Sequence, residues 1–147
     1  RATLLPYPVR ISRQDENTFV IEYELRKGSR VIYLDNAPDS VEPSIWGYST
    51  GYFEDDELVV ETRNFSANRW GNHAGVNSSV QKHLVERFSL SNNGLSLDIQ
   101  MTLTDPVYLT EPVTFDYHMA KIMERDFVQV SCTTENARLF LEGGYSR

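Results

Sequence analysis

The sequence predicts an all-β fold, an eight-stranded antiparallel up-and-down barrel of the lipocalin-like kind. Two observations predict it. Apolar and polar residues alternate with a period of two along most of the chain, which is typical of half-buried strands, and turn signals such as Lys27-Gly28 and Asn93-Gly94 separate these runs. A two-sheet β-sandwich is the alternative, because its strand orders produce similar patterns. We expect residues 1–147 to form one domain.

Composition restricts the partners. The chain has a net charge of −7 with 14 lysines and arginines, and no basic run occurs. Phosphate binding needs clustered cations, so we expect no nucleic-acid partner. The sequence also has no apolar run of about 18 residues, so we expect no membrane insertion.

The first hairpin is predicted at residues 18–25 and 30–35, after an extended lead-in over residues 1–14. Residues 36–43 contain two prolines and are predicted to form a loop. Further hairpins are predicted at 83–90 with 95–104, around Asn93-Gly94, and at 113–123 with 127–134. Sequential strands usually pair, which favours a meander.

A hairpin over Ser44–Phe65 is central to the predicted sheet. Its first strand is expected to carry Trp46, Tyr48, Thr50 and Tyr52 on one face and small residues (Gly47, Ser49, Gly51) on the other. An acidic turn, Glu54-Asp55-Asp56-Glu57, is expected to be a solvated hairpin tip. The polar stretch from Ser66 to Lys82 then lacks any strand or helix pattern. Long loops of this kind are often functional.

Three segments, GYSTGYFEDDELVVETRNF, HLVERFSL and TDPVYLTEPVT, together resemble a family of bacterial, typically exported proteins without an established activity. The family pattern is G-H-S-x-G-x-W-E-G-D-T-L-V-V-[DE]-T-x-x-F, then L-H-V-x-E-R-[FY], then D-P-x-x-[YF]-T-K-P-W-T. The resemblance implies a periplasmic or secreted location. The polar residues shared with the pattern are Asp56, Glu61, His83, Glu86, Arg87, Asp105 and Glu135.

This chain departs from the family pattern at three positions. The family has histidine where this chain has Tyr48 and Ser78, and tryptophan where it has Phe53. If those histidines carry chemistry in the family, this chain lacks part of it or has replaced it with a phenol.

Several common kinds of site are not indicated. The three histidines, His73, His83 and His118, have no zinc-ligand spacing, so we expect no metal. We likewise expect no cofactor. No G-x-S-x-G elbow occurs, and Cys132 lies among apolar alternating residues, where a structural role is expected.

The remaining candidate site lies on the predicted strand at residues 83–90. His83 and Arg87 share one face of that strand, whereas Glu86 shares the other face with Leu84 and Phe88. Whichever face points into the barrel brings an ionisable group with it, and such groups are acid–base candidates.

On the neighbouring strand, Glu61 is placed to orient the His83 ring. Tyr48, from the first strand of the Ser44–Phe65 hairpin, can supply a phenol to a substrate oxygen. The alternative is a structural ion pair between Glu61 and Arg87. We therefore assign Glu61, His83, Arg87 and Tyr48 as candidate catalytic residues.

These features predict a β-barrel that binds a small, partly apolar organic molecule. The expected aromatic lining is Trp46, Tyr48, Tyr52, Phe115 and Tyr117, with the loop of residues 66–82 as rim or lid. The enzymatic hypothesis is a cofactor-free lyase or isomerase in which His83 moves a proton. A non-catalytic carrier or interaction module is the alternative. A further alternative is a homo-oligomer that pairs through exposed sheet edges.

Overall fold

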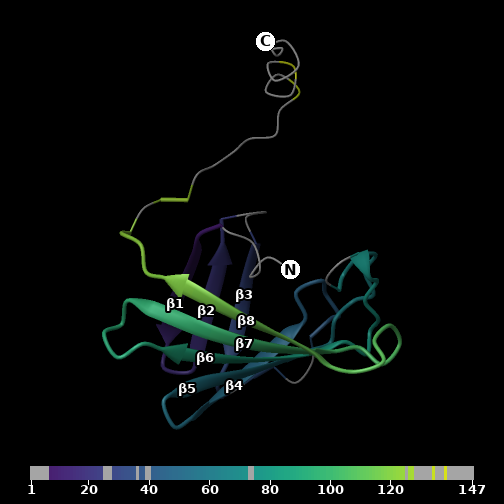
Figure 1. Cartoon of the computed structure of the whole chain (residues 1–147), viewed down its shortest axis with the longest axis horizontal. Coiled ribbons are helices and arrows are strands. Elements are labelled where there is room, and N and C mark those ends of the chain that lie inside the picture. Colours follow the sequence, from purple (N-terminus) through teal and green to yellow (C-terminus); the bar gives the residue numbers. More distant parts are fainter. Residues whose placement is uncertain are drawn as a thin grey trace.

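The computed structural model describes residues 7–24, 28–35, 37–38, 41–72, 75–124, 126–127, 134 and 138. Within these residues eight strands form a single sheet, and each strand lies beside the next one in sequence (Figure 1). The strands are β1 (Val9–Asp15), β2 (Thr18–Tyr23), β3 (Gly28–Tyr33), β4 (Tyr48–Glu54), β5 (Glu57–Arg63), β6 (His83–Leu90), β7 (Ser96–Thr104) and β8 (Val113–Ala120).

The sequential strand order confirms the predicted meander, but one pair differs from the expectation. β3 and β4 are parallel and share only the short register Ile32↔Ser49 and Tyr33↔Thr50, whereas the other six pairs are antiparallel. The segment between Tyr33 and Tyr48 is long enough to carry the chain back along the sheet, which parallel pairing requires.

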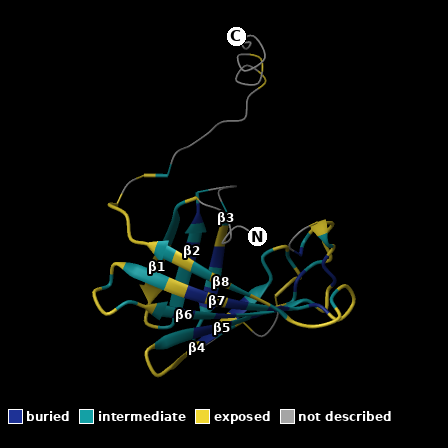
Figure 2. Ribbon diagram, viewed as in Figure 1, coloured by how far each residue is buried: buried dark blue, intermediate teal, exposed yellow. Residues whose placement is uncertain are grey.

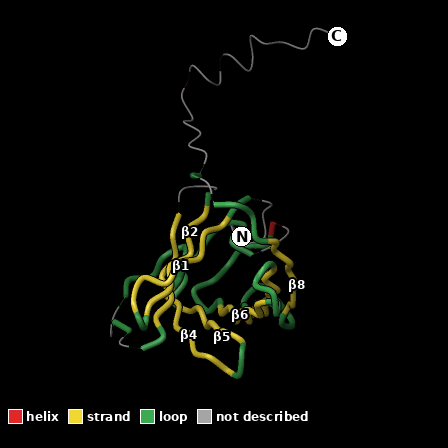
Figure 3. The backbone as a smooth tube through the Cα atoms, turned by 90° about the vertical axis from the view of Figure 1, so that its left-hand side faces the viewer, coloured by secondary structure: helices red, strands yellow, loops and turns green. Residues whose placement is uncertain are grey.

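The sheet curls into a half-barrel. Viewed from the side, it turns from β1 and β2 through β4–β6 to β8 (Figure 3). Among the described residues β1 pairs only with β2 and β8 only with β7, so the predicted closed cylinder is not formed there. The same residues contain one sheet, which does not fit the alternative of a two-sheet sandwich.

The concave side of the sheet, the inner face, carries the core. Strand alternation places on it the buried side chains of Ile21, Tyr23, Ile32, Val60, Phe88, Ile99 and Met101. They come from β2, β3, β5, β6 and β7, and buried segments follow these strands in Figure 2. The convex side, the outer face, carries most of the charged residues of β5–β8.

Strand β1 falls in the segment expected to be an extended lead-in, and this expectation was wrong. Its apolar residues on the inner face are Val9 and Ile11, and Ile11 is exposed. The pairing of β1 with β2 also shifts register between Arg13 and Asp15. Such a short apolar pattern gives a weak strand signal. The strand predicted at residues 127–134 lies almost entirely outside the described residues, as does Cys132.

The polar loop of residues 66–82 is fastened to the end of β7 by Asp105. This fully buried carboxylate accepts hydrogen bonds from Ser79 N (2.8 Å), Ser79 Oγ (2.7 Å) and Asn72 Nδ2 (3.0 Å). Burial acts to raise the pKa of Asp105, but these bonds and one from Val107 N outweigh it and lower that pKa. Asp105 is therefore an anchor for the loop.

Candidate functional site

An ion pair crosses the interior of the half-barrel. Arg30 projects from β3 and Glu86 from β6, and Arg30 Nη1 lies 2.6 Å from Glu86 Oε2. The two strands are not neighbours, because β4 and β5 lie between them in the sheet. The contact therefore joins opposite walls of the curl across its inner face. Arg30 is 7% exposed and Glu86 is 0% exposed.

The close contact leaves much of the hydrogen-bonding capacity of both groups unused. Among the described residues, Arg30 Nε, Arg30 Nη2 and Glu86 Oε1 have no hydrogen-bond partner, whereas Glu86 Oε2 is engaged by Arg30 Nη1 in the 2.6 Å ion pair. Burial opposes the charge of Arg30, but Glu86 and Tyr23 outweigh it and hold the guanidinium pKa above its ordinary value. Buried polar atoms without partners are rare in folded proteins.

Aromatic rings cover one side of this pair. Tyr23, which lies diagonally opposite Arg30 in the β2–β3 ladder, is stacked on Trp46 with ring centroids 5.3 Å apart and planes 11° apart. The Trp46 ring lies directly over Gly28, because a Cβ built at Gly28 would come within 2.2 Å of it. Gly28 and Arg30 lie two residues apart on the same face of β3, so Trp46 is a neighbour of the ion pair.

A second polar pair lies on the inner face, but it is satisfied. Ser49 Oγ and Thr62 Oγ1, both buried, share a hydrogen bond of 2.9 Å between β4 and β5. Within the described part of the chain, Arg30 and Glu86 are therefore the inner-face residues with buried polar atoms that lack a hydrogen-bond partner.

The structure divides the five aromatic residues that we predicted to line the interior. Trp46, Phe115 and Tyr117 pack against the core from the inner face. Tyr48 and Tyr52 point to the outer face instead. Tyr48 donates a hydrogen bond to the Pro38 carbonyl (3.2 Å), and Tyr52 is 50% exposed.

The reason is a break in the strand pattern at Gly47, whose φ of +70° turns the chain between Trp46 and β4. The small residues of β4 take the inner face, where Ser49 bonds Thr62 and Gly51 leaves room for the Ile32 side chain. The expectation that Trp46 shares a face with Tyr48 and Tyr52 was therefore wrong.

The three predicted charged residues lie on the outer face of β5 and β6. Leu84, Glu86 and Phe88 occupy the inner side of β6, which places His83 and Arg87 outside. His83 Nε2 lies 3.3 Å from Glu61 Oε2, so the structure brings these two together as predicted. Arg87 pairs with Glu54 and Glu57 at the hairpin tip, so the expected common site inside the barrel with His83 and Glu61 is not formed.

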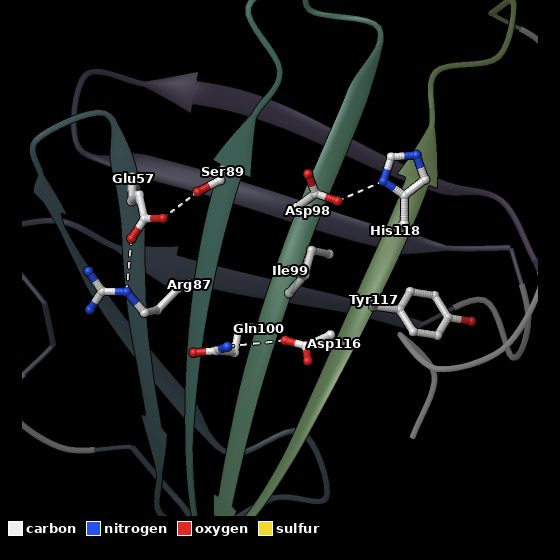
Figure 4. A pocket seen from close by; sticks show the side chains of 9 residues that line it. All are labelled: Glu57, Arg87, Ser89, Asp98, Ile99, Gln100, Asp116, Tyr117 and His118. Carbon is white, nitrogen blue, oxygen red and sulfur yellow. Dashed lines mark hydrogen bonds and ion pairs between the residues drawn. The ribbon is translucent and has the colours of Figure 1, made fainter.

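The outer face of β5–β8 carries an open hollow of about 430 Å³ (Figure 4). Its charged and polar side chains bond one another: Arg87 and Ser89 bind Glu57, Gln100 binds Asp116, and His118 binds Asp98. These contacts lower the pKa of Glu57, chiefly through Ser89 and then Arg87. Because these groups satisfy one another, the hollow is a weaker candidate for a ligand site than the inner face.

No group of three or more histidine, cysteine, aspartate or glutamate side chains in the described part of the chain is placed to hold a metal ion. Over the same residues, no helix has the length and apolar character needed to cross a membrane. Comparison with models of protein families, with curated proteins and with solved structures finds no match.

Arg30 is the site residue that sequence reasoning missed. It alternates with Ile32 on β3, so the same period of two that assigned the apolar faces places a guanidinium on the core side. Glu86 was noticed on the mostly apolar face of its strand. An arginine and a glutamate that both alternate with core residues are a signal for a buried pair.

Proposed function

We propose that the half-barrel binds a small, partly apolar organic molecule against its inner face, in the way lipocalin-like barrels use their interiors. The observation that carries this proposal is the buried Arg30–Glu86 pair with unsatisfied hydrogen-bonding atoms. Such a pair adds little to the stability of a purely structural core, because the desolvation of a buried ion pair often cancels or exceeds the attraction between its charges. A ligand that completes the missing bonds explains the pair.

The surroundings support the same proposal. Trp46 and Tyr23 provide a flat aromatic surface beside the pair, and Phe115 and Tyr117 pack at the edge of the core. Sites for small organic molecules are mostly apolar, with a few polar groups that fix the orientation of the ligand.

Binding can be tested with the neutral dye N-phenyl-1-naphthylamine, whose emission rises in apolar surroundings. We expect saturable one-to-one binding to the folded protein. Trp46→Ala should weaken binding by about tenfold, because the ring borders the proposed site. Tyr52→Ala is the matched control, since Tyr52 is 50% exposed and lies on the outer face of β4.

Equal binding by the parent protein and Trp46→Ala would reject the interior as the site. So would dye binding that appears only under conditions that unfold the chain. The substitution His83→Ala changes the outer face and is expected to leave dye affinity unchanged.

Proton transfer at the Glu61–His83 pair is the second candidate function, favoured by the 3.3 Å contact between the carboxylate and the imidazole. In that reaction His83 removes a proton and Glu61 orients the ring, as in a cofactor-free lyase or isomerase. Arg87 and Tyr48 do not join this pair, because Arg87 binds the hairpin tip and Tyr48 binds Pro38.

Solvent deuterium exchange tests the second candidate. Acetylacetone is incubated with the protein in deuterated buffer, and exchange at its acidic carbon is followed by NMR. Exchange that is lost in both His83→Ala and Glu61→Gln would support proton transfer. Exchange at the same rate in the variants and the parent would exclude it for this class of carbon acid.

A further inference from the structure

We infer that the ligand of the inner face is a neutral molecule that carries a hydrogen-bond acceptor and a donor side by side on a planar ring, such as an aromatic amide or a lactam. This inference rests on the proposed function, since it names the chemical class bound at the same site. It follows from the charge balance of the pair, from the atoms left without partners and from the surrounding surface.

The charge balance of the Arg30–Glu86 pair favours a neutral ligand. The Arg30 guanidinium and the Glu86 carboxylate already neutralise one another at 2.6 Å, and both are buried. An anionic or cationic ligand would add an uncompensated charge to this interior, which is strongly unfavourable in a low-dielectric environment. A neutral ligand adds none.

The polar atoms of Arg30 and Glu86 that lack partners call for both an acceptor and a donor on the ligand. Arg30 Nε and Nη2 are N–H donors without a partner, and Glu86 Oε1 is an acceptor without one, since Oε2 already faces Arg30 Nη1. A single ligand group that satisfies both residues must accept from the guanidinium and donate to the carboxylate. The C=O and N–H of an amide do this from neighbouring atoms. A ketone or an ether satisfies only Arg30, and a hydrocarbon satisfies neither.

The surface around the pair indicates the shape of the rest of the ligand. Beside the pair, the inner face is apolar and includes Ile21, Ile32, Val60, Met101 and the stacked rings of Tyr23 and Trp46. Trp46 is only half-buried and its ring lies over Gly28, so it offers a partly exposed aromatic surface on which a ligand can stack. A flat aromatic body suits such a surface.

Three probes with the same ring and different polar groups test the inference: benzamide, benzoate and toluene. Trp70→Phe removes the exposed tryptophan and leaves Trp46 as the single tryptophan, so the emission of Trp46 reports binding beside the pair. We expect benzamide to bind at least about tenfold more tightly than benzoate or toluene.

Two variants in the Trp70→Phe background sharpen the test. Glu86→Gln leaves Arg30 as an unbalanced cation, so the preference should change from benzamide to benzoate. Arg30→Met combined with Glu86→Leu makes the site apolar, so toluene should become the best of the three probes. Glu22→Gln removes a carboxylate from the exposed Arg10–Glu22 pair and serves as the matched control, with the parent preference retained.

The outcomes separate the inference from the proposed function. If no probe changes Trp46 emission and the naphthylamine dye also fails to bind, the proposed function fails. If the dye binds at the inner face but benzoate or toluene is preferred by the Trp70→Phe protein, the ligand class is wrong and the site stands. If Glu86→Gln does not fold, the double variant decides, because retention of the benzamide preference without either charged residue contradicts the inference.

Discussion

Glu86 and Arg87 are neighbours on one strand, yet their ion pairs differ in kind. Glu86, which has no exposed surface, pairs with Arg30 in the core. Arg87 pairs with Glu54 and Glu57 at a hairpin tip that is open to water. A surface pair contributes little to stability, because water and salt screen it. A buried pair makes each partner depend on the other, since either one alone is an uncompensated charge in the core.

Arg30→Met and Glu86→Leu are each expected to lower the free energy of unfolding by about 3–5 kcal/mol. The double variant should be about as stable as the parent, because apolar packing then replaces two desolvated charges. Chemical denaturation of all four proteins measures this coupling. Arg87→Met is the control, with an expected loss below about 1 kcal/mol. Additive losses in the double variant would show that the two residues are not a coupled pair.

Asp105 is expected to make the free energy of unfolding depend on pH. Asp105→Ala should cost about 3 kcal/mol of unfolding free energy, because it leaves several buried donors without an acceptor. The pKa of Asp105 in the folded protein lies below its ordinary value of 3.8, so its contribution is present above that value and is lost as the pH falls through the folded pKa.

Denaturation from neutral to acidic pH checks this dependence. The stability difference between the parent and Asp105→Asn should be constant at neutral pH and shrink below the ordinary value of 3.8. A difference that grows as the pH falls would contradict the assignment of Asp105 as an ionised anchor.

At the scale of elements, Gly47 decides which aromatic residue reaches the core. Its positive φ breaks the alternation of β4, sending Trp46 inward and Tyr48 outward. Counting every second residue assigns faces correctly only where the strand is regular. Because the count was continued through Gly47, it placed Trp46 and Tyr48 on the same face. The same limit applies at β3–β4, because alternation does not distinguish parallel from antiparallel pairing.

Gly47→Ala should lower the unfolding free energy by about 3 kcal/mol. An alanine there would adopt a positive φ, and its Cβ would lie 2.7 Å from the Arg63 carbonyl oxygen. Gly94→Ala is the matched control, because Gly94 has a φ of +66° but no atom within 4 Å of an added Cβ. We expect a loss of about 1 kcal/mol there. Equal losses at both positions would refute the close contact at Gly47.

At the scale of the whole molecule, the sequence predicts most of the strands and many of their faces but not how the sheet closes. Alternation separated Glu86 from His83 and Arg87 but did not decide which face points inward, and the site was assigned to His83 and Arg87, which lie on the outer face. That Arg30 would face Glu86 across the interior could not be predicted, because the contact depends on the curl of four strands together. Closure into a full barrel likewise depends on contacts far apart in sequence.

Amide hydrogen exchange tests the half-barrel. Amides of β6 and β7, strands with neighbours on both sides, should exchange most slowly. Amides of β1 and β8 that point away from β2 and β7 should exchange much faster. Equal protection of those edge amides would indicate that the two edges are paired and that the barrel is closed.

The most direct test of the central claim is NMR of the arginine Nε–H groups. Arg30 Nε–H, identified by its loss in the Arg30→Met/Glu86→Leu variant, is expected to exchange slowly with water, because it is buried without a partner. Benzamide should shift this signal in a saturable manner, with the same Kd that Trp46 emission gives. An Arg30 signal that stays unmoved while benzamide perturbs other parts of the protein would contradict binding at the Arg30–Glu86 pair.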